Sequence, residues 1–339
     1  MSPDPQASRK APAPPAPRRR VLGWSAASLA GFAAPRAFAQ DKAYPVRPIR
    51  FVVPFAASAG ADILARVYAK ALADVAGQPV VVENRGGANG IVAVKAVLAA
   101  PADGYTVFFA SNSALITNAA VVRNLPYDPV QDFAPVSILD GGYCVLVVPG
   151  NSRLRTMADL VAEAKRRPGA LNHGAGSAQY ALWNAWLNEI VGMRTQNIEY
   201  KGSGEAALAA ASAQVDYSIV AVAPARPMLQ AGRLRALMYT GDARAPTLPD
   251  VPTSAEAGAA GFNAFAWGAV AVRAGTPEPV IAELDRMFRQ TAKHPEVLAN
   301  LEAQGMQPMH TGPQKMRQFQ VEEIVRLKRL AAATGLSIE

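Results

Sequence analysis

The chain has 339 residues and a formal net charge of +8, and it contains one cysteine and three histidines. Six basic residues and one acidic residue lie within the first 39 positions, so the 300 residues that follow carry a net charge of only +3. This low charge excludes a strongly basic main body, and we expect no binding of nucleic acid. Because single hydrophobic cores stop growing at about 300 residues, the length predicts two lobes.

The first 39 residues have the layout of an export signal. Three consecutive arginines at 18–20 lead into an apolar stretch, Val21 to Phe32, and the small-residue triplet 37–39 follows. This order fits a twin-arginine-type signal peptide at 1–39, whose cargo crosses the bacterial inner membrane already folded. The alternative is a membrane anchor, but the apolar stretch is well short of the roughly 20 residues that span a bilayer. We therefore expect a mature protein that is freely soluble in the periplasm.

The first half of the mature chain alternates short β-rich runs with helical patterns. The pattern predicts strands at Ile49–Val53, Pro79–Glu83 and Tyr105–Ala110, with helices over 63–75 and Ile91–Ala99 between them. A glycine-rich turn at 86–90 precedes the second of these helices. Strands that alternate with helices in this way predict right-handed βαβ units around a largely parallel sheet.

The second half repeats this alternation. Thr156 and Asp159 form a capping-box pattern at the start of a helix that Gly169 ends. The other predicted elements are strands at Val145–Val148, Leu171–Gly174, Leu234–Thr240 and Phe265–Val272, a helix opened by Thr276-Pro277 and a terminal helix from Pro313. Ser177 is placed to cap a further helix. We expect its tryptophans, Trp183 and Trp186, to belong to the core rather than to form a stacking platform.

Two strand–loop–helix junctions are the strongest candidate site. The junctions 55–62 and 174–180 each present unpaired backbone N–H groups at the start of a helix, and such groups attract anions. Neutral hydrogen-bonding side chains accompany them, which suits a carboxylate held by dipoles. The predicted ligand-binding residues are Phe55, Ser58, Ala59, Gly60, Ser111 and Asn112 from the first lobe and Ser177, Ala178 and Gln179 from the second. The alternative is that both loops only cap their own helices.

Two charged residues near these loops are expected to serve other roles. The carboxylate of Asp62 would repel a bound anion, so we expect it to cap the local backbone or to hold a bridging water. Lys201 precedes another helix start, and we expect it to be a solvated surface charge rather than a ligand clamp.

Reactive residues give only weak signs of catalysis or metal binding. Cys144, the single cysteine, cannot form an intramolecular disulfide, and we expect it to be a small buried core residue. The histidines are far apart and lack metal-ligand spacing, so we expect neither a metal nor a cofactor. Gly202-Ser203-Gly204 lacks the spacing of a nucleophile elbow. The rival function is a periplasmic α/β hydrolase, whose sign would be a titrating His173 close to a serine and an acid.

Seven segments, in order along nearly the whole mature chain, resemble the Bug-type extracytoplasmic receptors of tripartite tricarboxylate transporters. They are Tyr44–Phe55, Gly77–Arg85, Asp103–Thr106, Leu125–Pro129, Asp132–Val136, Gly232–Leu237 and Leu248–Thr253. The resemblance implies an α/β periplasmic-binding-protein fold of type II-like form, in which each lobe is a mainly parallel sheet flanked by helices and two hinge strands join the lobes. It implies lobe 1 at 40–144 and 268–339, and lobe 2 at 145–267.

The same resemblance implies a monomeric, non-enzymatic receptor that holds a small carboxylated metabolite in the cleft between the lobes. Inner-membrane transporter subunits or a sensor would be its partner. Some positions depart from the family pattern: Ala56–Ala59 replaces a Pro-Pro-Gly-Gly loop, Tyr180-Ala181 replaces Ser-His, and a strand acid is absent near Val220. An amino-bearing ligand would lose its partner without that acid. We therefore expect a plain carboxylate or dicarboxylate, with an apolar or aromatic body, rather than an amino acid.

Overall fold

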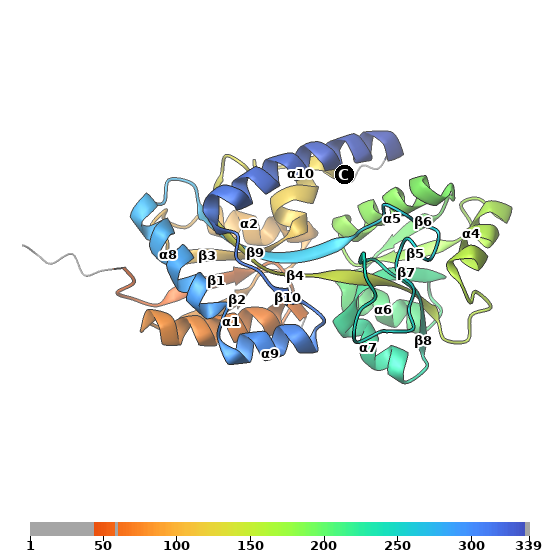
Figure 1. Cartoon of the computed structure of the whole chain (residues 1–339). Helices are drawn as coiled ribbons and strands as arrows, with labels where there is room; N and C mark the ends of the chain where they lie inside the picture. Colours follow the sequence, from red (N-terminus) through yellow and green to blue (C-terminus); the bar gives the residue numbers. More distant parts are fainter. Residues whose placement is uncertain (1–43, 58–59, 336–339) are drawn as a thin grey trace, which may run out of the picture. The chain divides into compact units, whose positions relative to one another are not determined.

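The computed structural model of the chain describes residues 44–57 and 60–335 (Figure 1). The predicted signal peptide at 1–39 lies outside the described residues, as do Ser58 and Ala59 of the first candidate loop. Among the helices of the described ranges, none combines the length and the apolar character needed to cross a membrane.

The first lobe is built on three parallel strands, in the order β2-β1-β3. They are β1 (Ile49–Val53), β2 (Val80–Asn84) and β3 (Thr106–Ser111), and the helices between them are α1 (Gly60–Ala76), the short 3-10 helix η1 (Ala88–Gly90) and α2 (Ile91–Leu98). Because successive side chains of a strand point to opposite faces, Phe51 packs with the α1 side chains and Val52 with those of α2. Helices on both faces explain why β1 is apolar apart from the half-buried Arg50.

Two long strands connect this sheet to the second lobe. Strand β4 (Phe133–Pro149) runs antiparallel to β9 (Phe265–Arg273) from Phe133 to Tyr143, and from Cys144 onward it pairs with β7 and β8 instead. Strand β9 in turn pairs with β3, from Ser111 opposite Gly268. Strands β4 and β9 are therefore the predicted hinge strands. The predicted lobe boundaries at 144/145 and 267/268 coincide with these changes of pairing, and we keep them as a proposal.

The second lobe follows β4 in the chain. Its elements are α4 (Met157–Arg166), β5 (Asn172–Ala175), α5 (Ala178–Val191), β6 (Gln196–Glu199), α6 (Ser203–Ala211), β7 (Tyr217–Ala221), α7 (Val222–Gln230) and β8 (Leu234–Tyr239). Strand β5 lies parallel to both β6 and β7. The predicted capping box at Thr156 and Asp159 is confirmed. Cys144 is fully buried as expected, and Trp183 is 2% exposed, whereas Trp186 is only half-buried.

The remaining elements of the first lobe follow strands β3 and β9. A π-helical turn, η2 (Ser113–Thr117), and α3 (Asn118–Val121) follow β3, while α8 (Glu278–Thr291), α9 (Pro295–Ala303), β10 (Gln307–Pro308) and α10 (Gly312–Thr334) follow β9. Helix α10 contacts both β4 and α5, so it reaches from the first lobe to the second.

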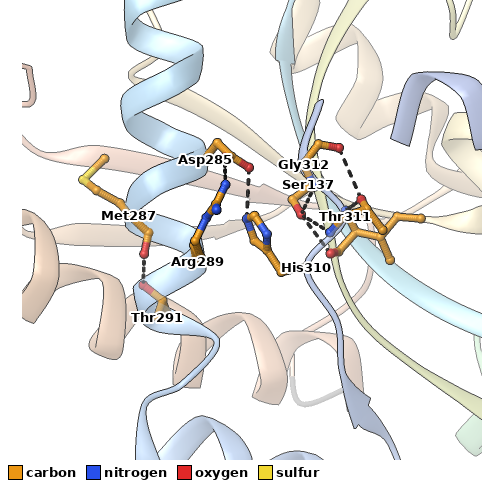
Figure 2. A network of polar contacts seen from close by, with 9 residues as sticks. Ser137, Asp285, Met287, Arg289, Thr291, His310, Thr311 and Gly312 are labelled. Carbon is orange, nitrogen blue, oxygen red and sulfur yellow. Dashed lines mark hydrogen bonds and ion pairs between the residues drawn. The ribbon is translucent and has the colours of Figure 1, made fainter. Parts of the chain in front are cut away.

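Polar contacts fasten the start of α10 to the hinge strand (Figure 2). The N–H groups of Thr311 and Gly312 donate to the hydroxyl of Ser137 at 3.0 and 3.2 Å. Beside them, His310 Nε2 lies 3.0 Å from Asp285 Oδ1, and Arg289 contacts the other oxygen of the same carboxylate, Oδ2, at 2.8 Å. Because Ser137 belongs to β4 and Asp285 to α8, these contacts hold three separate segments of the first lobe together.

Candidate functional site

A cleft of about 670 Å³ lies where several parallel strands end. Its wall includes residues that follow the carboxyl ends of β1, β3, β5, β6 and β7, together with parts of both hinge strands and the end of α9. The carboxyl ends of parallel strands are the usual ligand-binding edge of α/β sheets, because loops and helix starts meet there. The site predicted from the sequence also uses loops that follow strands, at 55–62 and 174–180.

The structure places four of the predicted ligand-binding residues in the wall of this cleft: Phe55, Asn112, Ser177 and Gln179. Gly60 is the first residue of α1 and Ser111 is the last of β3, while Ala178, the first residue of α5, is not among the described wall residues. Ser58 and Ala59 lie outside the described residues. The set as a whole stays a prediction.

The start of α5 is hydrogen-bonded to the first lobe. The N–H of Ala178 donates to Asn89 Oδ1 at 3.2 Å, and the hydroxyl of Ser113 donates to that of Ser177, also at 3.2 Å. A third contact joins the hydroxyl of Thr117 to Gln179 Oε1. The Ala178 amide is therefore occupied in this conformation. Within the described chain Ser177 makes no side-chain cap on α5, so the predicted capping role is wrong, because its hydroxyl bonds to the other lobe.

The two charged residues near the loops have different surroundings, and the capping or water-binding role of Asp62 stays a prediction. Asp62 is 2% exposed and accepts hydrogen bonds from Arg66 at 3.1 Å and from Asn84 at 2.9 Å, so it fastens α1 to the end of β2. Lys201 is exposed, as predicted, but it also lines the cleft. Its backbone N–H donates to Glu205, which lines the same wall.

Sequence reasoning missed the hinge strands as part of the site. Asp140 and Tyr143 of β4 line the cleft, as do Trp267 and Gly268 of β9. Asp140 is fully buried, and burial raises the pKa of its carboxyl group from 3.8 to about 7. The nearby Gly268 amide and Tyr68 hydroxyl offset only part of this shift. No local sequence signal marked Asp140, because the glycines Gly141 and Gly142 that follow it are typical of a turn.

His173, the histidine of the hydrolase alternative, is locked inside the second lobe. Its Nε2 accepts a hydrogen bond from the Ile219 amide at 3.1 Å, and its Nδ1 lies 2.9 Å from Asn197 Oδ1. Burial lowers the pKa of the imidazole to about 4, so it is neutral near pH 7. Neither partner is a nucleophile or an acid, and the arrangement that a hydrolase requires is not supported by the described residues.

Comparison with known proteins agrees with this geometry. Residues 64–336 match the tripartite tricarboxylate transporter family receptor. Protein BugT of Bordetella pertussis is 35% identical over 317 residues, which cover 92% of this chain and 96% of that protein.

Solved structures give the same fold. An R. palustris protein solved with adipate is 31% identical with a TM-score of 0.81, and the alignment covers 87% of this chain and 99% of that one. MatC from Rhodopseudomonas palustris, solved with bound malate, is 30% identical with a TM-score of 0.78, covering 85% and 99%. The periplasmic binding protein BugD has a TM-score of 0.80 at 26% identity, covering 87% and 100%. The predicted two-lobe α/β fold is confirmed, and the chain belongs to the receptor family of tripartite tricarboxylate transporters, which includes the Bug proteins.

Proposed function

We propose that the protein is a monomeric periplasmic receptor that captures a small carboxylate or dicarboxylate and presents it to an inner-membrane transporter or sensor. The observation that carries this proposal is the cleft of about 670 Å³ at the carboxyl ends of the strands of both lobes. It is supported by relatives of the same fold that were solved with adipate and malate. We propose no catalytic role.

The wall of the cleft suits a ligand with an acidic end and an apolar body. Apolar and aromatic side chains dominate the wall, among them Phe55, Phe109, Tyr143, Trp267 and Met306. A carboxylate at a helix start gains about 1.5–3 kcal/mol for each hydrogen bond it accepts. Roughly four such bonds give micromolar binding, about −8 kcal/mol net, after the cost of association.

We further propose that the lobes, at 40–144 with 268–339 and at 145–267, close on the ligand by bending at β4 and β9. The hydrogen bonds of Asn89 with Ala178 and of Ser113 with Ser177 support this, because they join the two proposed lobes and must break when the lobes separate. A ligand that bridges both lobes would then select the closed form, which the membrane partner recognises.

Isothermal titration of the chain without its first 39 residues against mono- and dicarboxylates tests the proposal. We expect saturable binding for at least one compound, with micromolar affinity, and mass spectrometry of the co-purified solute should find a carboxylic acid. Flat heats for every carboxylate, together with a bound amine or sugar, would refute the carboxylate assignment. Turnover of an ester that disappears in His173→Ala would instead favour the hydrolase.

Export is tested separately. Fractionation of cells that express the full chain should place it in the periplasm, and replacing Arg18 and Arg19 by lysine should retain it in the cytoplasm. Export of the double variant at the normal rate would contradict a twin-arginine route.

A further inference from the structure

Asp140 is a buried acid in the wall of the cleft. It lies on β4 opposite Gly268 of β9, so it is held where the two hinge strands cross between the lobes. Its side chain is fully buried, and neither carboxyl oxygen receives a hydrogen bond of normal geometry from any residue in the described ranges. The Tyr68 hydroxyl next to it donates to the Leu139 carbonyl instead, at 3.2 Å.

The carboxyl group of Asp140 packs directly against Gly268 of β9. A Cβ atom at Gly268 would come within 2.8 Å of Asp140 Oδ1, so only glycine leaves room for the acid at this position. Gly268 and Asp140 both line the cleft. The carboxyl group therefore packs between Gly268 of the cleft wall and Tyr68 of α1.

No positive charge in the described chain forms an ion pair with this acid. The titratable group that contacts it is the phenol of Tyr68 on α1, whose own pKa is raised by burial. The other titratable residues of the cleft wall are Tyr143, Tyr180, Lys201 and Glu205, and α9 contributes the neutral Asn300 and Gln304. A desolvated carboxyl group without a cation is stable in its neutral form, in which it becomes a hydrogen-bond donor.

We propose that Asp140 selects diacids, by donating a hydrogen bond from its protonated carboxyl group to one carboxylate of the ligand while the helix starts hold the other. This inference rests on the proposed function and adds the group that recognises the second acidic end. The bound carboxylate raises the proton affinity of Asp140 further, because two like charges in contact disfavour each other. Binding above neutral pH therefore takes up one proton from the buffer, which stays on the Asp140 oxygen.

Titration calorimetry of the wild type, Asp140→Asn and Asp140→Leu tests this. The ligands are adipate as the diacid and hexanoate as the monoacid, from pH 5.5 to 8.5, in buffers of different ionisation enthalpy. For the wild type we expect adipate affinity that is constant below about pH 6 and falls up to tenfold per unit above about pH 7, with proton uptake approaching one per ligand at pH 8.5. Hexanoate should show neither effect.

The two Asp140 variants distinguish the role of the hydrogen-bond donor from that of the titrating proton. Asp140→Asn keeps a donor but cannot titrate, so adipate should bind with an affinity independent of pH and without proton uptake. Asp140→Leu removes the donor, and we expect at least tenfold weaker adipate binding at pH 6 with unchanged hexanoate binding. Glu199→Gln, an exposed acid outside the described cleft wall, is the control and should keep the wild-type pH profile.

Each other outcome overturns the inference. Adipate binding that is independent of pH in the wild type, and unchanged in Asp140→Asn, would make Asp140 a structural residue and leave the proposed function intact. Affinity for an amino acid such as glutamate that rises with pH and is lost in Asp140→Asn would show that a charged Asp140 pairs with an ammonium group. Absence of binding to every carboxylate in the wild type would refute the proposed function itself.

Discussion

Two buried ionisable groups of the molecule, Asp140 in the hinge and His173 in the second lobe, have opposite surroundings. Both are fully buried, and burial shifts the pKa of each toward its neutral form. His173 has a partner at each ring nitrogen, whereas neither oxygen of Asp140 has one among the described residues. Burial alone therefore does not identify a functional group. The combination of an unpartnered polar atom and a position in the cleft wall does.

The largest expected effect concerns the stability of the wild type and of Asp140→Asn as a function of pH. The folded chain keeps the Asp140 proton up to about pH 7, whereas the unfolded chain releases it near 3.8. The folded state therefore binds more protons between these values, and this group's contribution to stability falls as pH rises through them. At about 1.4 kcal/mol per unit, the total loss reaches ~4 kcal/mol and then levels off.

Urea unfolding at several pH values measures this directly. Asp140→Asn has no titrating carboxyl group at this position, so it lacks this loss of stability. Its free energy of unfolding should rise relative to that of the wild type from pH 4 to 7, and it should be the more stable protein at pH 8. Curves for the two proteins that stay parallel from pH 4 to 8 would show that Asp140 is already ionised in the folded state, and would remove the contrast with His173.

A smaller loss of stability is expected when His173, which has a partner at each ring nitrogen, is replaced. His173→Ala leaves the Ile219 amide without its partner inside the core, removes one of the two contacts of Asn197 Oδ1, and creates a cavity. We expect a decrease of about 3 kcal/mol in the free energy of unfolding at pH 7, with ligand affinity unchanged. His294→Ala is the control: this side chain is 29% exposed and lies 3.9 Å from Asp74, so its loss should cost under about 0.5 kcal/mol. Equal losses in the two variants would contradict a structural role for His173.

The smallest effect tests the hydrogen bond that joins the lobes at α5. Asn89 has a positive φ of 51°, so Asn89→Gly removes the side chain without straining the backbone. Losing one neutral hydrogen bond costs about 1 kcal/mol, and the Ala178 amide should then exchange with deuterium roughly fivefold faster. The Tyr200 amide, which donates to Ala175 at 2.8 Å, is the internal control. Equal protection of Ala178 in both proteins would show that this contact does not hold the lobes together.

Local signals in the sequence were sufficient for much of the fold. Strand β1 has the predicted bounds because its apolar run ends at Pro54, and the Thr156–Asp159 capping box forms because both partners lie within one turn. In contrast, only the end of β4 was predicted, at Val145–Val148. Asp140, Gly141 and Gly142 interrupt the apolar pattern and suggest a turn.

The glycines of β4 are required by close packing with other segments rather than by a turn. A Cβ atom at Gly141 would lie 2.3 Å from the Phe265 ring, and one at Gly142 would lie 3.0 Å from the Gly305 carbonyl. They are needed because other segments approach the strand closely, which no local pattern reveals. The candidate site likewise combines residues with a local sequence signal and residues brought in by tertiary contacts. The loop residues Phe55 and Ser177 were found from helix starts, whereas Asp140 joins them only through the tertiary fold.

The most direct measurement is a crystal structure of the protein without its first 39 residues in complex with adipate, at pH 6. We expect the ligand in the cleft, with one carboxylate at the start of α1 or α5 and the other within 3.0 Å of an Asp140 oxygen, which is hydrogen-bond distance. A ligand bound elsewhere, or a cleft that stays closed to adipate while the protein binds it in solution, would contradict a receptor that recognises carboxylates between its lobes.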